Sequence, residues 1–326
     1  MTRPRMALLL APIFFLASTT LVAAPEGNEI PDAYATSATK ITLGDGRALN
    51  LRCAGKGERV VLFEAGTNAD SSAWFRVLPL LAGTARACAY DRAGYGFSDA
   101  GPMPRDLEAD VADLHELIRA ARLPLPLVLV GHSLGSNIVR QYAIRHPHDV
   151  AGMVLVDPPE QGEEAAMPVQ WKREDAALRE KRDAFLIACE QSAQAGTLMP
   201  GCLRAAPPWM GARVAAAVSA NKSRPDYWRT LHSELSANQR LFAEPVPDDE
   251  RYGDIPLILL AADTPYDGVA DDVRTALEQA RAQTRQRILS ASTTSRRIDV
   301  PGASHDIQLD RPEAVASAVR EMLHQP

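Results

Sequence analysis

The chain has 326 residues, of which 46% are hydrophobic and 23% are charged. These fractions match the averages of globular proteins, about 45–50% and 25%, and exclude a disordered, collagenous or coiled-coil chain. The 35 basic and 41 acidic residues give a formal net charge of −6, so nucleic acid is not expected as an electrostatic partner. The length suits one large domain or two ordinary ones.

The N-terminal segment resembles a secretory signal peptide. Two arginines precede an uncharged run over residues 6–25, which ends in small residues. The strongly apolar part ends at Leu16 and is shorter than the roughly 20 residues that a membrane span needs. We therefore predict a signal peptide over residues 1–24 and export to a periplasm or out of the cell, without stable membrane insertion after cleavage. An uncleaved anchor is the alternative.

Export changes the interpretation of the four cysteines, because disulfides persist outside the cytosol. Cys53 and Cys88 fall in two expected strands, whereas Cys189 and Cys202 flank a short stretch that contains glycine and proline. Of the three possible pairings we favour Cys53–Cys88 with Cys189–Cys202; four separate buried thiols are the alternative. The spacing of cysteines and histidines does not suit zinc, so we expect no metal.

The predicted elements begin with a hairpin, residues 41–43 and 48–51, around a Gly-Asp-Gly turn. Short apolar runs without alternation follow, and such runs are typical of strands buried on both faces of a sheet. They lie at residues 60–63, 87–90, 127–130, 153–156 and 257–260. Residues 106–121 place an apolar stripe on one face of a helix. This alternation of strands and helices predicts an α/β fold.

The alternation is interrupted over residues 158–253, where the chain is helix-like, polar and punctuated by prolines. Strand and helix signals then resume, at residues 257–260, 273–287, 297–300 and 312–323. We predict a core in two parts, residues 25–157 and 254–326, separated by a helical cap insertion over residues 158–253.

The sharpest chemical signal is Gly131-His132-Ser133-Leu134-Gly135, between an apolar strand and a helical stretch. A serine hydroxyl is a weak nucleophile unless it is presented bare and beside a base, and a tight strand-to-helix turn presents it in this way. The glycines allow the close backbone approach that such a turn requires. Ser133 is therefore the candidate nucleophile.

Three further motifs stand in order around this turn. Glu64-Ala65-Gly66-Thr67 follows an early strand, Asp-Arg-Ala-Gly-Tyr-Gly-Phe-Ser occupies residues 91–98, and Gly302-Ala303-Ser304-His305 precedes the last helix. With these motifs the chain resembles the α/β-hydrolase superfamily from Ile41 to Leu323. The resemblance implies a mostly parallel central sheet flanked by helices, with an inserted helical cap and no cofactor.

By the same resemblance, His305 is the general base, and the backbone amides of Leu134 and Thr67 form the oxyanion hole. The remaining histidines are assigned surface or capping roles. The resemblance also implies that the insertion covers the site. Its candidate pocket walls are Trp171, Phe185, Trp209, Tyr227, Trp228 and Phe242; ordinary packing within a small helical domain is the alternative for each.

The acid that orients His305 has three candidates. Asp157 stands at the end of the strand after the serine's helix, as in some superfamily members. Asp263 and Asp267 stand after the penultimate strand, where the family most often places this residue, but their spacing fits that position imperfectly. We favour Asp157, with Asp263 and then Asp267 as alternatives.

The predicted function is that of an exported serine hydrolase. It would cleave a carboxylic ester or related acyl bond of a small molecule through an acyl-Ser133 intermediate. Serine at this position argues against the dehalogenases and epoxide hydrolases that attack with a carboxylate. The alternatives are an acyltransferase or an aminopeptidase on the same scaffold and, in another class, a non-catalytic ligand-binding module with the hydrolase fold.

Overall fold

The structure, a computed structural model, describes residues 29–263 and 269–324. The predicted signal peptide, residues 1–24, and the candidate acid Asp267 lie outside these residues. In the described ranges, no helix has both the length and the apolar character needed to cross a membrane.

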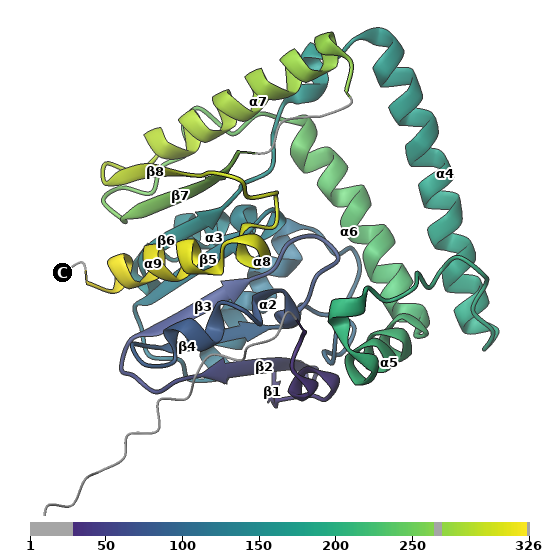
Figure 1. The fold of residues 1–326 in the computed structure, drawn as a ribbon, viewed down its shortest axis with the longest axis horizontal. Coiled ribbons are helices and arrows are strands. Elements are labelled where there is room, and N and C mark those ends of the chain that lie inside the picture. Colours follow the sequence, from purple (N-terminus) through teal and green to yellow (C-terminus); the bar gives the residue numbers. More distant parts are fainter. Residues whose placement is uncertain (1–28, 264–268, 325–326) are drawn as a thin grey trace, which may run out of the picture.

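The described part of the chain forms one eight-stranded sheet in the order β1-β2-β4-β3-β5-β6-β7-β8 (Figure 1). The pairs β1–β2 and β2–β4 are antiparallel and all other neighbours are parallel, which confirms the predicted α/β class. The strands are β1 Thr39–Thr42, β2 Ala48–Ala54, β3 Val60–Glu64, β4 Arg86–Tyr90, β5 Leu127–His132, β6 Val150–Val156, β7 Leu257–Ala262 and β8 Ser295–Val300.

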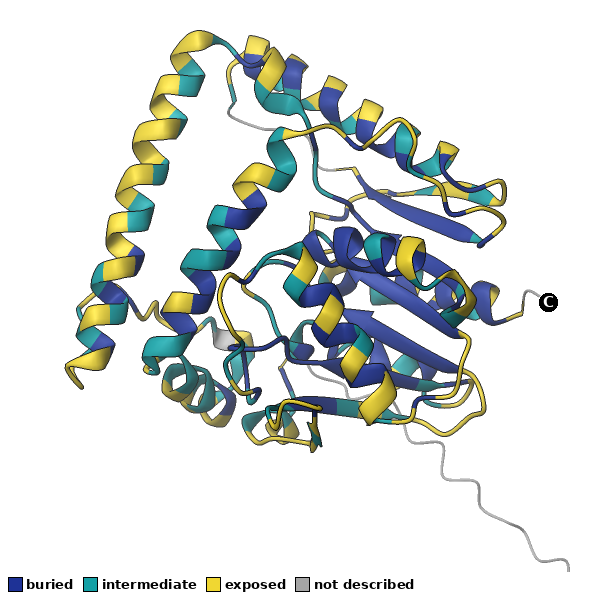
Figure 2. Ribbon diagram, turned by 180° about the vertical axis from the view of Figure 1, so that it is seen from behind, coloured by how far each residue is buried: buried dark blue, intermediate teal, exposed yellow. Residues whose placement is uncertain are grey.

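Helices cover both faces of the sheet, which is why the central strands carry continuous apolar runs. On one face α2 and α3 pack with Ile288 of α7, and on the other face α1 and α9 pack. Figure 2 shows the central strands buried between these layers. The helices outside the insertion are α1 Leu78–Leu81, α2 Leu107–Ala120, α3 Leu134–Arg145, α7 Asp271–Ser290, α8 Ile307–Asp310 and α9 Pro312–Leu323, with short 3-10 turns η1 Asp32–Ala35, η2 Ser71–Trp74 and η3 Pro147–Asp149.

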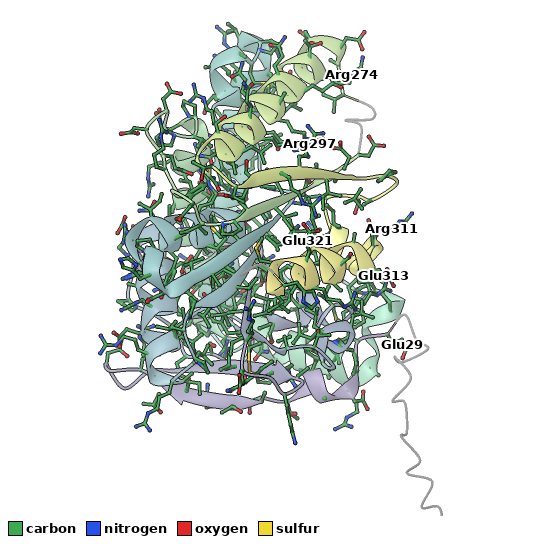
Figure 3. The ribbon with its side chains drawn as sticks, turned by 90° about the vertical axis from the view of Figure 1, so that its left-hand side faces the viewer. Glu29, Arg274, Arg297, Arg311, Glu313 and Glu321 are labelled. Atoms are coloured by element: carbon green, nitrogen blue, oxygen red, sulfur yellow. A yellow bond between two sulfur atoms is a disulfide. The ribbon has the colours of Figure 1, made fainter. Side chains whose placement is uncertain are left out.

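The sheet ends in β8, an edge strand that carries charged side chains. Arg296 pairs with Glu321 of α9, and Arg297 pairs with Asp299. Figure 3 labels Arg297 on this strand and Glu321 on the neighbouring helix. Charges on an edge strand discourage pairing with a strand of another molecule.

The segment between β6 and β7 is helical. It contains η4 Glu163–Ala166, α4 Val169–Gln194, η5 Pro208–Met210, α5 Ala212–Lys222 and α6 Pro225–Ala243. The long helix α4 lies along α6 at the periphery, and its outer face is largely exposed (Figures 1 and 2). The buried face of α6 includes Tyr227 and two polar side chains, Glu234 and Asn238.

Both disulfides of the favoured pairing are present. Cys53 and Cys88 are directly opposite each other in the β2–β4 ladder, and their Cα atoms are 4.0 Å apart. Cys189, near the end of α4, is bonded to Cys202 in the following loop. The first bridge joins two strands of the core, and the second closes the turn after α4.

Candidate active site

Ser133 occupies a sharp turn between β5 and α3. Its backbone has φ 50° and ψ −123°, a conformation that a non-glycine residue adopts only when its surroundings impose it. A Cβ on Gly131 would lie 2.3 Å from the Gly135 carbonyl oxygen, and one on Gly135 would lie 2.4 Å from that of Glu64. These contacts explain why both flanking positions are glycine.

The turn also places a helix N-terminus beside the serine. Leu134 is the first residue of α3, so its amide has no intrahelical acceptor and lies at the positive end of the helix dipole. On the other side, a Cβ on Gly66 would lie 3.1 Å from the Ser133 Cβ, so the loop after β3 passes close to the hydroxyl. The first turn of α3 and the loop after β3 therefore both lie beside the candidate nucleophile.

His305 stands on the loop between β8 and α8, and its Nδ1 lies 2.8 Å from Oδ2 of Asp157. Asp157 directly follows β6 and has a positive φ of 42°. The structure thus brings Asp157 to His305, whereas Asp263 is exposed beyond β7. With Nδ1–H donated to the carboxylate, Nε2 is the nitrogen left to accept a proton.

The other oxygen of Asp157 has partners that the sequence did not indicate. Oδ1 accepts from the Ala262 amide at 3.1 Å and from Nη2 of Arg285, in α7, at 2.6 Å. Both side chains of this ion pair are buried. Arg285 stands in a polar helix far along the chain, so nothing in its local pattern distinguishes it from a surface arginine.

These contacts shift the two ionisation equilibria. Burial raises the pKa of Asp157, but the hydrogen bond from His305 and the charge of Arg285 outweigh it, so the pKa lies below its usual value. Burial lowers the pKa of His305, but the hydrogen bond and charge of Asp157 outweigh it, so the pKa is raised above 6.5. The pair therefore favours a carboxylate beside a comparatively basic imidazole.

A second histidine, His132, is hydrogen-bonded to the loop that carries His305. Nε2 of His132 lies 3.0 Å from the His305 carbonyl oxygen. Burial, together with the nearby His305, lowers the pKa of His132 to about 4, so its ring is neutral and donates this hydrogen bond. His132 therefore fixes the backbone of the His305 loop, a role that the sequence did not suggest.

Ser133, His305 and Thr67 line one cavity of about 450 Å³. This volume falls within the roughly 300–1,000 Å³ of small-molecule sites. The described residues of the insertion that line it are Trp209, Met210, Val218, Asn221, Lys222 and Tyr227.

Only two of the six aromatic side chains considered as pocket walls, Trp209 and Tyr227, line this cavity. Trp171 packs against Val273 of α7, and Phe242 packs against the main core. Trp228 is buried within the insertion, and Phe185 is exposed on α4. The sequence could not separate the two groups, because an aromatic residue that packs helices together has the same local pattern as one that lines a pocket.

Comparison with known proteins identifies the family and supports the fold. A model of the alpha/beta hydrolase family matches residues 60–318. The chain belongs to the alpha/beta hydrolase family. Among solved structures, the epoxide hydrolase CorEH superposes with a TM-score of 0.62 at 16% identity, over 87% of this chain and 97% of that one. A thermophilic esterase from Thermogutta terrifontis gives 0.55 at 18% identity, over 88% and 98%. These likenesses show a shared fold.

Curated relatives match over shorter stretches. Uncharacterized protein YqjL of Bacillus subtilis (strain 168) is 35% identical over 98 residues, which are 30% of this chain and 39% of that protein. An AB hydrolase superfamily protein of Gibberella zeae is 33% identical over 102 residues, 30% of this chain and 32% of that protein. The chain thus matches well under half of the length of these relatives.

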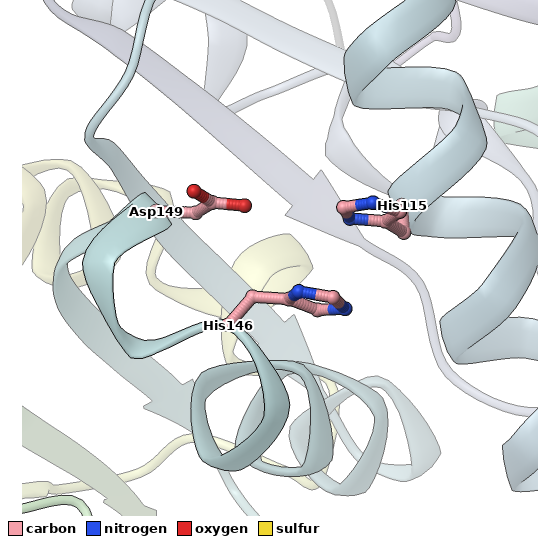
Figure 4. Close-up of side chains that lie close together, drawn as sticks. All are labelled: His115, His146 and Asp149. Carbon is pink, nitrogen blue, oxygen red and sulfur yellow. The ribbon is translucent and has the colours of Figure 1, made fainter.

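A separate side-chain cluster lies near the end of α3 (Figure 4). The His115 and His146 rings stack at 4.0 Å with only 9° between their planes, and the Tyr142 hydroxyl donates to Asp149. Zinc bonded to nitrogen at about 2.0–2.1 Å needs in-plane lone pairs that converge on one point. Because the two rings are nearly parallel, their lone pairs do not converge, and the cluster packs α2 against the end of α3.

Proposed function

We propose that the protein is a serine hydrolase that cleaves a carboxylic ester or related acyl bond through an acyl-Ser133 intermediate. The observation that carries this proposal is the placement of Ser133, on its strained turn, in the same cavity as a histidine bonded to a buried carboxylate. Nucleophile, base and orienting acid are the parts that acyl transfer by serine requires.

The proposed reaction has two stages, formation and hydrolysis of the acyl-enzyme. The Ser133 Oγ attacks the carbonyl carbon while Nε2 of His305 takes the hydroxyl proton. The oxyanion that forms accepts hydrogen bonds from the amides of Leu134 and Thr67, which need no reorganisation to point at it. His305 then protonates the leaving alcohol, and the carbon–oxygen bond breaks. A water molecule, activated by the same histidine, releases the acid and restores Ser133.

Asp157 acts on His305 rather than on the substrate. Its carboxylate holds the tautomer in which Nδ1 carries the proton, and it stabilises the imidazolium that forms when Ser133 is deprotonated. The contact at 2.8 Å supports this role for Asp157 over Asp263.

The alternatives differ in what they would need. An aminopeptidase would need acidic groups of the insertion near the substrate's amino terminus. Three acidic residues of the insertion that could serve, Glu163, Glu164 and Glu190, are not among the described residues that line the cavity. Glu190 instead pairs with Arg229. An acyltransferase would use the same acyl-enzyme with an alcohol in place of water, so product analysis with an added alcohol distinguishes the two.

We also propose that the mature protein is exported. The signal-like N-terminus and the two disulfides support this assignment. Fractionation of cells that express the full-length chain tests it: retention of the protein in the cytosol with free thiols would contradict export.

The deciding experiment combines a fluorophosphonate probe with p-nitrophenyl esters of graded acyl length. Wild type should be labelled and should prefer one range of chain lengths, whereas Ser133→Ala should lose both labelling and turnover. Ser72→Ala is the matched control, because Ser72 lines the same cavity away from the turn. Labelling that survives in Ser133→Ala, or labelling that is lost in Ser72→Ala, would refute the assignment.

A further inference from the structure

Helix α6 of the insertion is hydrogen-bonded to the loop that carries the proposed oxyanion amide of Thr67. Oε1 of Glu234 accepts from the Asn68 amide at 2.9 Å, and Nδ2 of Asn238 donates to the Thr67 hydroxyl at 3.0 Å. The Tyr227 hydroxyl donates to Oδ1 of Asn68 at 2.5 Å. Three side chains from one face of α6 therefore hold two consecutive residues of this loop.

Arg92 holds the preceding two residues from the other side. Its Nη1 donates to the Ala65 carbonyl at 2.6 Å, and its Nη2 donates to the Gly66 carbonyl at 2.7 Å. Arg92 itself is fixed between two buried carboxylates, Glu64 and Glu234, each at 2.8 Å. The Arg92 side chain is only 2% exposed, so little water competes for these bonds.

Because the peptide bond is planar, these contacts also fix the direction of the Thr67 N–H. The Gly66 carbonyl and the Thr67 N–H belong to one planar trans peptide unit, so they point in opposite directions. When Arg92 binds the Gly66 oxygen, the Thr67 N–H is directed to the opposite side of the loop. The bond from the Asn68 amide to Glu234 fixes the next peptide unit, in which Asn68 has a positive φ of 56°.

We propose that Glu234, acting with Arg92, is a positioning residue of the oxyanion hole, so that the insertion helps to assemble the catalytic site as well as covering it. This inference rests on the proposed serine hydrolase function. Glu234 connects the contacts made by α6 with those made by Arg92, because one of its oxygens accepts from the Asn68 amide and the other accepts from Arg92. An oxyanion donor must be held to within about 0.5 Å to be effective, which is why a flexible loop would need this support.

The test separates positioning from general stability with a matched pair of variants. Glu234→Gln removes a buried carboxylate from Arg92, and Glu250→Gln removes a largely buried carboxylate from Arg140. Neither Glu250 nor Arg140 lines the cavity. We expect Glu234→Gln to lower kcat for a p-nitrophenyl ester about 10- to 100-fold with KM within about two-fold, less than the roughly 10²–10³ that follows loss of a donor. Glu250→Gln should leave kcat unchanged.

A transition-state readout makes the result specific. A boronic acid that adds to Ser133 forms a tetrahedral adduct that uses the oxyanion hole, so its affinity should fall in Glu234→Gln in proportion to kcat. An unchanged kcat and boronate affinity in folded Glu234→Gln would overturn the inference. An equal loss in both variants would also overturn it, because the effect would then follow from destabilisation alone.

Two further measurements complete the design. If Glu234→Gln does not fold, Asn238→Leu removes an uncharged bond to the same loop, and a fall in kcat of about 2- to 10-fold at constant KM is expected from one hydrogen bond; no fall would overturn the inference. Fluorophosphonate labelling of wild type is run alongside. Absence of labelling and turnover in wild type would refute the proposed function itself, whereas normal wild-type activity with unaffected variants refutes only the positioning role.

Discussion

Replacing Arg285 with methionine should move the acid limb of the pH–rate profile to higher pH. When His305 is protonated, the Asp157 carboxylate lies between two cations, with Arg285 at 2.6 Å from one oxygen and His305 at 2.8 Å from the other. The guanidinium and the imidazolium repel each other. Removing the guanidinium charge therefore stabilises protonated His305, raises its pKa further and keeps it inactive as a base to a higher pH.

The magnitude follows from the separation of the charges. Two hydrogen bonds and the width of a carboxylate put them about 7 Å apart, and at an effective dielectric constant of about 20 their repulsion is about 2.4 kcal/mol, or about 1.7 pH units. The His305 side chain is 50% exposed, so solvent screens part of this repulsion. We expect a shift of about 1 unit after this screening.

The assay is kcat/KM for a p-nitrophenyl ester from about pH 5 to 9, which reports the pKa of the base in the free enzyme. The acid limb of wild type should have its midpoint above 6.5, because the pKa of His305 is raised. Arg285→Lys is the control: only one guanidinium nitrogen, Nη2, bonds the Asp157 carboxylate, so a lysine ammonium can replace the charge. A limb that stays in place or moves to lower pH in Arg285→Met would refute the reasoning.

Three other predictions test the site and the scaffold. Asp157→Asn should lower kcat by about 10³- to 10⁴-fold, whereas Asp263→Asn should keep kcat within about two-fold of wild type. The reverse order would assign the role of orienting acid to Asp263. The double replacement Cys53→Ala and Cys88→Ala removes a disulfide that spans 35 residues, which should lower the free energy of unfolding by about 4 kcal/mol and Tm by about 6 °C in calorimetry. An unchanged Tm would contradict this. Gly66→Ala places a Cβ 3.1 Å from the Ser133 Cβ, so kcat should fall while Tm stays unchanged. Turnover equal to that of wild type would contradict this, because the loop would then have moved to accommodate the methyl group.

Much of the fold could be predicted from the sequence because the central strands are covered on both faces. Burial on both sides requires an unbroken apolar run, and the runs at residues 60–63 and 127–130 fall within β3 and β5. The turn that carries Ser133 could also be predicted, since its glycines, its serine and its place after a strand are all local features. The same holds for α2, where the expected range 106–121 encloses the observed Leu107–Ala120.

The supporting groups of the site could not be predicted, for a physical reason. Arg285 and Glu234 stand on helices among other charged residues, and a buried ion pair has the same local pattern as a solvated face. Arg285 reaches Asp157 across 128 positions of sequence, and Glu234 reaches Arg92 across 142. Only the tertiary structure determines which of many acids and arginines are brought together.

Different segments of the insertion contact different parts of the site. Helix α6 is committed to the loop beside the nucleophile, whereas most insertion residues that line the cavity fall in residues 209–222, within η5 and α5. Substitutions in this short stretch can therefore change the lining of the cavity without altering Ser133, His305 or the loop that α6 contacts. Exchange of residues 209–222 for the matching segment of a related protein therefore replaces most of the insertion's cavity lining. Helix α6, which follows this segment, keeps its contacts with the rest of the chain in such an exchange.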